Sequence, residues 1–312
     1  MLSILTPAFN ESSSLEALHA RIVETMASLK VEWEWLIIDD HSRDGTFAVI
    51  ERLAATDLRV RGIRLARNSG SHVAIACGLH HVRGAAAVMM AADLQDPPET
   101  LGAMLERHRA GAQVVWATRR ERPGGQTHQW FGAVYYWIMR RVVGMTDMPA
   151  TGADFFLIDR VVIDAFRQLR ERNISVLALI TSLGFRQDYV EYDKQPRVSG
   201  RSGWSMARKI KLVVDSVTGF SAAPIRVCAA LGALLFIVGA LLGVVWLIGP
   251  RVSAVLMVLA VVTGLGGLQL LALGVMGEYV WRALDESRRR PLYFVEAVVG
   301  TPDLESTGSG TR

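Results

Sequence analysis

The sequence predicts an α/β protein in which a mostly parallel sheet, covered by helices on both faces, is followed by two long apolar helices. Short apolar segments alternate with segments of helical periodicity through the first 120 residues, as in a parallel sheet with crossover helices. Acidic residues close two of these apolar segments, at Asp39 and Asp93. Two uncharged runs, 227–248 and 252–277, are each long enough to cross a hydrocarbon core of about 30 Å as a helix.

The alternation places five strands and the helices between them. Each strand is a short apolar segment, and Pro7 closes the first one. The expected strands cover residues 2–7, 35–38, 60–65, 86–92 and 114–117. The expected helices begin after residues that cap helices or form turns, and they cover about 15–26, 46–53 and 72–82, with a further helix before residue 114.

The two acidic strand ends are expected to open at the same edge of the sheet. Ligands of open α/β sheets bind at the carboxyl ends of the strands. In an extended segment Asp93 and Gln95 point the same way, which suits one side of a Mg²⁺ or Mn²⁺ site that also holds a diphosphate. A solvated acidic turn after the strand is the alternative. No Gly-x-Gly-x-x-Gly follows the first strand, which argues against a dinucleotide-binding Rossmann fold.

Two basic loops are candidates for binding phosphate. Arg119, Arg120 and Arg122 follow an expected strand, and guanidinium groups match phosphate oxygens in bidentate pairs, although a solvated surface turn is equally open. Residues 195–204 form a second flexible basic loop, a candidate lid over phosphates. Asp154 lies between a glycine turn and an apolar strand, where it either caps the turn or orients an incoming acceptor.

The charges around the two uncharged runs predict a membrane hairpin. Basic residues flank both outer ends, while the link between the runs holds Arg251 alone, so the positive-inside rule places both ends in the cytoplasm. A helix over 205–220 with one apolar side is expected to lie on the membrane surface before the first run. That run starts beyond residue 225, so it is not a signal peptide.

Composition excludes two other classes of protein. The formal net charge is +4, but no basic stripe lies in the first 200 residues, so nucleic acid is a poor candidate partner. Cys77 and Cys228 are the two cysteines, and they do not indicate a disulfide framework.

Seven short motifs follow one another between about residues 2 and 295. They occupy 6–11, 39–46, 68–70, 92–99, 152–155, 197–204 and 277–293. Taken together they resemble the family 2 glycosyltransferases of the GT-A fold. More narrowly, the chain is similar to the polyprenyl-phosphate glycosyltransferases, the group of dolichyl-phosphate mannose synthase and the bacterial GtrB-like enzymes.

The resemblance implies a role for each matched residue. The residues that would bind the nucleotide-sugar are Pro7, Phe9, Glu11, Asp39, Asp40, Arg119, Arg197 and Ser202, the last three through phosphates. Asp93 and Gln95 would bind Mg²⁺ or Mn²⁺ on the donor diphosphate, and Asp154 would lie near the acceptor. Asp93 and Asp154 are therefore the candidate catalytic residues.

The chain departs from this group at two positions. Many relatives carry an Asp two residues before the position of Asp93, where this chain has Ala91, so the metal is expected to have fewer protein ligands or to bind more weakly. Gly203-Trp204 stands where many relatives have a Lys-Tyr pair, which removes one phosphate-binding cation.

The implied reaction is an inverting transfer of a sugar from a nucleoside-diphosphate sugar, with a UDP-sugar favoured, to a polyprenyl phosphate such as undecaprenyl phosphate. The second pKa of a phosphate monoester is about 6, so the acceptor is already ionised and needs no strong general base. Asp154 is then expected to position the acceptor. A non-catalytic GT-A-fold membrane scaffold or regulator is the alternative. A processive polysaccharide synthase is remote, because the Gln-x-x-Arg-Trp motif of that group is absent from the sequence.

The predicted organisation has five parts. They are a GT-A domain (1–204), a juxtamembrane amphipathic helix (205–225), two transmembrane helices (226–277), a cytoplasmic juxtamembrane segment (278–300) and a disordered tail (301–312). The resemblance further implies a homo-oligomer in the bacterial cytoplasmic (inner) membrane, with the catalytic domain and the C-terminus facing the cytoplasm.

Overall fold

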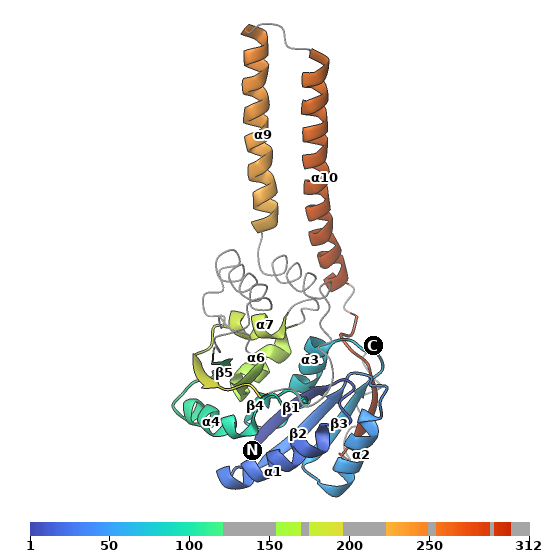
Figure 1. The fold of residues 1–312 in the computed structure, drawn as a ribbon, viewed down its shortest axis with the longest axis vertical. Coiled ribbons are helices and arrows are strands. Elements are labelled where there is room, and N and C mark those ends of the chain that lie inside the picture. Colours follow the sequence, from blue (N-terminus) through green and yellow to red (C-terminus); the bar gives the residue numbers. More distant parts are fainter. Residues whose placement is uncertain (121–153, 170–174, 196–222, 249–253, 288–289, 301–312) are drawn as a thin grey trace.

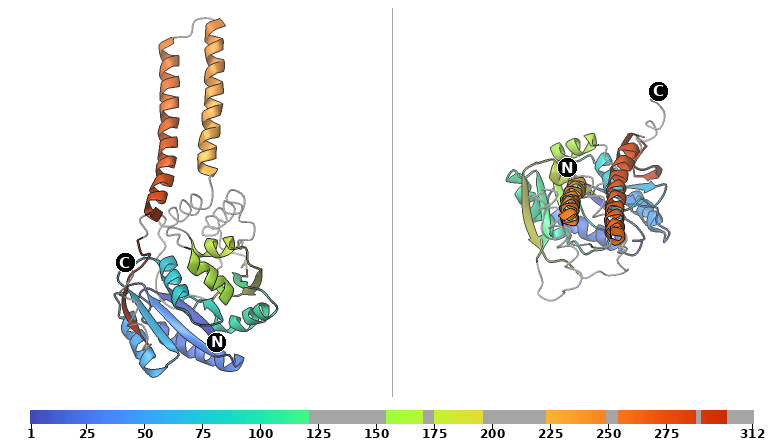
Figure 2. Two further views of the ribbon diagram at one scale, coloured as in Figure 1. Left: turned by 180° about the vertical axis from the view of Figure 1, so that it is seen from behind. Right: turned by 90° about the horizontal axis from the view of Figure 1, so that it is seen from above.

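A computed structural model of the chain describes residues 1–120, 154–169, 175–195, 223–248, 254–287 and 290–300. The described residues form a sheet domain and a pair of long helices that extends away from it (Figure 1). The two long helices stay side by side when the molecule is seen from behind and from above (Figure 2).

The sheet domain is built on an eight-stranded sheet in the order β7-β5-β6-β4-β1-β2-β3-β8. Its strands are β1 (Leu2–Ala8), β2 (Trp33–Asp39), β3 (Val60–Leu65), β4 (Ala86–Met89), β5 (Val114–Arg119), β6 (Phe155–Asp159), β7 (Gln187–Tyr192) and β8 (Val295–Val299). β1 pairs in parallel with β2 and β4, and β2 pairs in parallel with β3. The predicted mostly parallel sheet is therefore confirmed.

Two strands run against the others. β6 is antiparallel to both β4 and β5, and β8 is antiparallel to β3, whereas β7 is parallel to β5. The carboxyl ends of the six parallel strands therefore meet at one edge of the sheet, together with the start of β6. This edge carries the residues that follow β1, β2, β3, β4 and β5 and the residue that precedes β6.

Helices cover both faces of the sheet, as the sequence predicts. The helices of the domain are α1 (Leu15–Leu29), α2 (Thr46–Thr56), α3 (Ser71–His81), α4 (Leu101–Arg109), α6 (Arg160–Gln168) and α7 (Val176–Ser182), with a short 3-10 turn η1 (Pro98–Thr100). The apolar faces of α1, α2 and α4 pack into one core cluster, and those of α3, α6 and α7 pack into a second cluster on the opposite face. The central strands β1, β2 and β4 are thus buried on both sides, which explains their largely apolar sequences, whereas the edge strand β7 is polar and only partly buried.

The long helices are α9 (Ala223–Ile248) and α10 (Ala254–Ser287), which contain most of the two uncharged runs, and α10 continues ten residues past the second run into a charged segment. Within the described residues, no helix meets the length and apolarity needed for a membrane span. The predicted surface helix over 205–220 and the predicted tail over 301–312 lie outside the described residues, and the domain boundaries stay predictions.

Candidate active site

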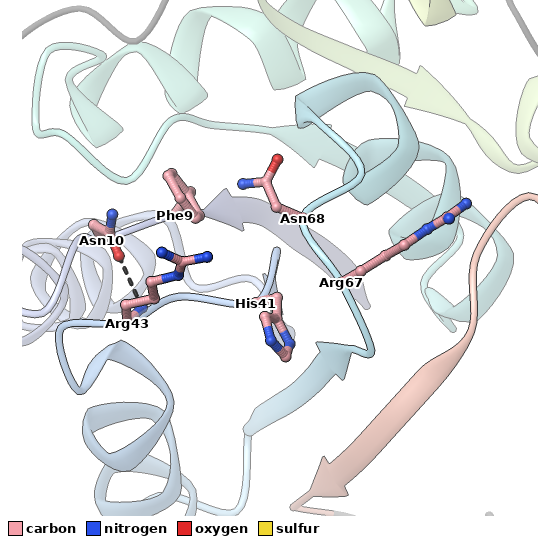
Figure 3. Close-up of a pocket in the computed structure, with 6 residues that line it drawn as sticks. All are labelled: Phe9, Asn10, His41, Arg43, Arg67 and Asn68. Carbon is pink, nitrogen blue, oxygen red and sulfur yellow. Dashed lines mark hydrogen bonds between the residues drawn. The ribbon is translucent and has the colours of Figure 1, made fainter.

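The loops that follow β1, β2 and β3 form a pocket of about 590 Å³ at the carboxyl edge of the sheet (Figure 3). Each of the three loops contributes two lining residues. They are Phe9 and Asn10, His41 and Arg43, and Arg67 and Asn68. In Figure 3 the Arg43 guanidinium extends toward the Phe9 ring, whereas the Arg67 side chain points away from the other five residues. An exposed aromatic ring beside amide and guanidinium groups can stack on a planar base and bind anionic oxygens.

The first two of these loops are held together by hydrogen bonds between backbone and side chains. The backbone N–H of Asn10 donates to Ser42 Oγ at 2.9 Å, and the backbone N–H of Arg43 donates to Asn10 Oδ1 at 2.9 Å. The Glu11 N–H donates to Thr46 Oγ1 at 2.9 Å. Because each bond joins residues more than 30 positions apart, the pocket wall is a single hydrogen-bonded unit before any ligand binds.

Asp39 and Asp40 lie beneath this wall and are both buried. Asp40 accepts the N–H groups of Ser69 at 2.7 Å and Gly70 at 2.8 Å, so it fixes the third loop at the start of α3. Burial raises the pKa of Asp40 above its ordinary value, and these two hydrogen bonds oppose that rise. Asp39 accepts the N–H of Ser42 at 3.0 Å and so holds the second loop. Both acids shape the pocket from below.

The other two residues predicted to bind the nucleotide lie beside this unit. Pro7 is half-buried near the end of β1. Glu11 follows the pocket residue Asn10 and accepts a hydrogen bond from Ser14 Oγ at 3.1 Å. Phe9, Pro7, Glu11, Asp39 and Asp40 are therefore gathered at one end of the sheet edge, but only Phe9 among them lines the pocket. The roles of the other four stay predictions.

Asp93 and Gln95 lie in a tight turn after β4, so the expected extended segment is wrong here. β4 ends at Met89, Leu94 has the left-handed φ of 62°, and Asp93 Oδ1 accepts the N–H of Gln95 at 3.2 Å. An Asp that bonds to the backbone two residues ahead stabilises a turn rather than a strand. The Asp93 side chain is consequently buried at the base of the turn.

The donor set at this turn fits a divalent metal that is shared with a substrate. Among the described residues, no group of three or more His, Cys, Asp or Glu side chains is close enough to hold a metal. Mg²⁺ is usually bound by one or two carboxylates together with substrate phosphates, so Asp93 and the Gln95 amide oxygen suit such a shared site. Gln95 Nε2 donates to the backbone oxygen of Gln195 at 3.3 Å, which directs the amide nitrogen away and leaves the oxygen as the available ligand.

Asp154 and Arg119 meet where β5 and β6 reach the same edge. Arg119 Nη2 lies 3.5 Å from Asp154 Oδ2, and the Asp154 side chain is 59% exposed. Burial opposes the charge on Arg119, but Asp154, Tyr192 and Asp96 around it raise its pKa above the ordinary value. Arg119 therefore presents a permanent cation beside an exposed carboxylate.

Sequence reasoning missed Asp96, whose carboxylate is 1% exposed behind the Asp93 turn. It accepts Tyr192 Oη–H at 2.7 Å and the N–H of Ala91 at 3.3 Å, and Lys194 Nζ lies 3.9 Å away. Burial raises the pKa of Asp96 above its ordinary value. The sequence shows Asp96 as a second acid three residues after Asp93, but its contact with Tyr192 comes from β7, almost a hundred residues later.

The remaining predicted residues divide into two groups. Arg120 lies 3.5 Å from Glu191 and 3.6 Å from Asp193, so in this structure it is part of an exposed ion-pair group. Arg122, Arg197 and Ser202 lie outside the described residues. The pocket residues Asn10, His41, Arg43, Arg67 and Asn68 were given no role from the sequence, since loops from three strands had to be brought together before they formed a site.

Comparison with known proteins assigns the chain to a family. Residues 3–167, just over half of the chain, match the model of glycosyl transferase family 2. The chain belongs to glycosyl transferase family 2. The match includes β1 to β6 and therefore the pocket, the Asp93 turn, and Arg119 and Asp154.

Relatives of this glycosyltransferase match it over nearly their whole length. An uncharacterized glycosyltransferase of Synechocystis sp. is 33% identical over 305 residues, which cover 96% of each chain. A bactoprenol glucosyl transferase of Shigella phage SfV is 30% identical over 301 residues, which cover 95% of this chain and 98% of the phage protein. A crystal structure of glucosyl-3-phosphoglycerate synthase from Mycobacterium tuberculosis with Mn²⁺, UDP-glucose and phosphoglyceric acid has a TM-score of 0.49 and is 14% identical, covering 69% of this chain and 77% of that one.

Proposed function

We propose that this family 2 enzyme transfers a sugar from a nucleoside-diphosphate sugar to a polyprenyl phosphate at a membrane surface, with inversion at the sugar carbon. The observation that carries the proposal is the sheet edge, which has a preformed pocket at β1–β3 and a separate group of charged residues at β4–β6. The near full-length similarity to a bactoprenol glucosyl transferase supports a polyprenyl phosphate as the acceptor.

The pocket is suited to the nucleotide part of the donor. The Phe9 side chain is 44% exposed and offers a face on which a base can stack. Arg43 brings positive charge to the same pocket, and the diphosphate of the donor is anionic. A UDP-sugar is the donor that we favour, and the identity of the sugar is left to the experiment below.

Asp93 and the Gln95 amide oxygen would hold Mg²⁺ or Mn²⁺ together with the donor diphosphate. When bound, the metal would neutralise charge that develops on the leaving diphosphate. In this chain Ala91 has no side-chain oxygen, and its N–H is used by Asp96, so the protein supplies few ligands and the diphosphate supplies the others.

The chemical step needs alignment and charge stabilisation more than proton transfer. An oxygen of the acceptor phosphate forms a bond to the anomeric carbon as the bond from that carbon to the diphosphate breaks, and the electron pair leaves with the diphosphate. The acceptor is already ionised at neutral pH, so no strong base is required. Arg119 would bind a phosphate, and Asp154, 3.5 Å from it, would fix the direction of Arg119 and of the acceptor.

We also propose that α9 and α10 insert into the bacterial cytoplasmic membrane and bring the lipid acceptor to the sheet edge. Apolar side chains along both helices are largely exposed, including Val227 at 57%, Leu241 at 61%, Val255 at 69% and Leu270 at 72%. An apolar surface of this extent needs an apolar environment. With the basic flanks on the inner side, the catalytic domain and the C-terminus would face the cytoplasm. A homo-oligomer that covers part of this surface is compatible with the same placement.

Ala91 supports the second candidate function, a non-catalytic membrane scaffold of the same fold. A chain that has lost a metal ligand could keep its lipid contacts and its pocket without turning over a donor. The scaffold predicts nucleotide or lipid binding with no sugar transfer. The retained Asp93, Gln95, Arg119 and Asp154 favour the enzyme.

The test is a transfer assay on the detergent-purified full-length chain. Undecaprenyl phosphate, Mg²⁺ or Mn²⁺ and a panel of UDP- and GDP-sugars are mixed with the protein, and the lipid is measured by mass spectrometry. A metal-dependent gain of one sugar on the lipid would establish the reaction and name the donor. An unchanged lipid mass across the panel, with nucleotide binding still detected by calorimetry, would favour the scaffold.

A further inference from the structure

The strand β8 follows the two long helices in the chain and pairs with the sheet domain that precedes them. It follows α10 by fewer than ten residues and pairs with the edge strand β3, with Ile63 opposite Val298 and Arg64 opposite Ala297. Figure 1 shows β8, coloured red, beside β3 at one side of the sheet domain. Residues after the second long helix thus become part of the sheet that carries the nucleotide pocket.

This C-terminal segment contacts two of the loops that line the pocket. Glu296 Oε2 lies 3.1 Å from Nδ1 of the pocket residue His41. The same nitrogen lies 3.0 Å from the backbone oxygen of Leu65, so Nδ1–H is shared between two acceptors. The backbone oxygen of Phe294 accepts the N–H of Ala66 at 2.9 Å, immediately before the pocket residue Arg67.

Glu296 also holds an arginine that runs beneath the pocket. Arg64 Nε donates to Glu296 Oε2 at 3.0 Å, while Arg64 Nη1 lies 3.4 Å from Asp39 Oδ2. Arg64 Nη2 donates to the backbone oxygen of Ser42 at 3.4 Å. Asp39 Oδ2 is buried and has no hydrogen-bond partner of good geometry in the described residues, so its charge is balanced mainly by Arg64. One carboxylate on β8 therefore orients both His41 and the cation that supports the second loop.

The loop needs such a support because its backbone is strained at His41. His41 has a φ of 59°, in the left-handed region that residues other than glycine seldom adopt. A side chain in this conformation keeps its place only where its surroundings fix it. Its partners are the backbone of Leu65 and the carboxylate of Glu296, which comes from a segment 255 residues away.

We infer that Glu296 is a positioning residue for the donor nucleotide, which it serves by holding His41 and Arg64 in the arrangement that forms the pocket. The inference rests on the proposed function of the pocket and extends it to the end of the chain. It also assigns a role to β8. This strand follows the long helices in the chain and supplies the carboxylate that completes the nucleotide site.

The test compares Glu296→Gln with Glu16→Gln in the full-length chain. Glutamine keeps the size of Glu296 and loses its charge. Glu16 is a matched control because its exposed ion pair is with Arg52, and neither residue lines the pocket. Glu296 is 46% exposed, so we expect a moderate effect, about a fivefold increase in the Kd for UDP or GDP by calorimetry. Glu16→Gln should leave the Kd unchanged. At saturating donor, the kcat of either variant should differ from that of the wild type by less than about twofold.

The controls separate a positioning role from a structural one. The melting temperature of Glu296→Gln without nucleotide should match that of the wild type, and Glu296→Gln should change the Kd less in a His41→Ala background than in the wild type. Unchanged nucleotide binding in Glu296→Gln would overturn the inference alone. A wild type that binds neither UDP nor GDP and transfers no sugar would overturn the proposed function, and this inference with it.

Discussion

The two ends of the sheet edge hold their acidic residues in different ways. At the β1–β3 end, Asp39 and Asp40 are buried and accept backbone N–H groups, so they fix the shape of three loops. At the β4–β6 end, Asp154 is exposed and lies beside Arg119, while Asp93 is buried and accepts the N–H of Gln95 within its own turn. The first end is a preformed pocket for a ligand, and the second holds the charged side chains that we propose take part in the reaction. Substitutions at the two ends should therefore change different kinetic constants.

Asp93→Asn should have the largest effect of any single substitution at the edge. The change keeps the size and one oxygen of the side chain but removes the charge that would bind the metal, so kcat should fall by about 10³-fold. Calorimetry with nucleotide in the absence of metal should show unchanged binding, because the pocket lies at the other end. Asp164→Asn, on the exposed surface of α6, is the matched control. Full activity of Asp93→Asn would remove Asp93 from the mechanism.

Asp154→Asn should be less damaging, with kcat lower by about 10- to 100-fold. Asp154 is expected to direct Arg119 and the acceptor rather than to accept a proton, and asparagine keeps its shape. The pH dependence of kcat distinguishes a positioning residue from a proton acceptor. The pH profile of the variant should have the same shape as that of the wild type. Loss of the acidic limb in the variant would instead identify Asp154 as a general base.

Asp40→Asn tests the preformed end. An amide has one acceptor oxygen where the carboxylate has two, so the N–H of Ser69 or of Gly70 loses its partner, at a cost of about 1–3 kcal/mol of unfolding free energy. The KM for the donor should rise while kcat changes little. A fall in kcat with unchanged KM would show that the two ends are not separate.

Tyr192→Phe should have the smallest effect, and its effect should depend on pH. Burial raises the pKa of Asp96, so ionised Asp96 lowers the stability of the folded state as the pH rises above the ordinary carboxyl pKa. The Tyr192 hydroxyl lowers that pKa again, so its removal should destabilise the protein more at pH 7.5 than at pH 4.5, by about 1–2 kcal/mol. Urea denaturation at the two pH values measures this difference. Equal destabilisation at both would mean that the protonation state of Asp96 does not change between the two pH values.

The parts of this architecture that depend on local pattern were predictable from the sequence. The strand over 60–65 and the helices on both faces follow from apolar periodicity, and the acidic strand ends follow from the direction of a parallel sheet. At Asp93 the sequence favoured an extended segment and kept a turn as the alternative, since the apolar run through Ala92 reads as strand and the left-handed Leu94 has no sequence signature. Asp96 and Glu296 were also missed, because their partners come from β7 and from loops more than 200 residues away. Such contacts depend on tertiary structure alone.

The transfer assay on the wild type and Asp93→Asn tests the central claim most directly. With the accepted donor, Mg²⁺ and undecaprenyl phosphate, the wild type should add the mass of one sugar to the lipid, and chelation of the metal or the Asp93→Asn substitution should abolish the gain. Nucleotide binding should survive in the variant. A lipid whose mass never changes, or a variant that transfers sugar as fast as the wild type, would contradict the assignment of this edge as a metal-assisted glycosyltransferase site.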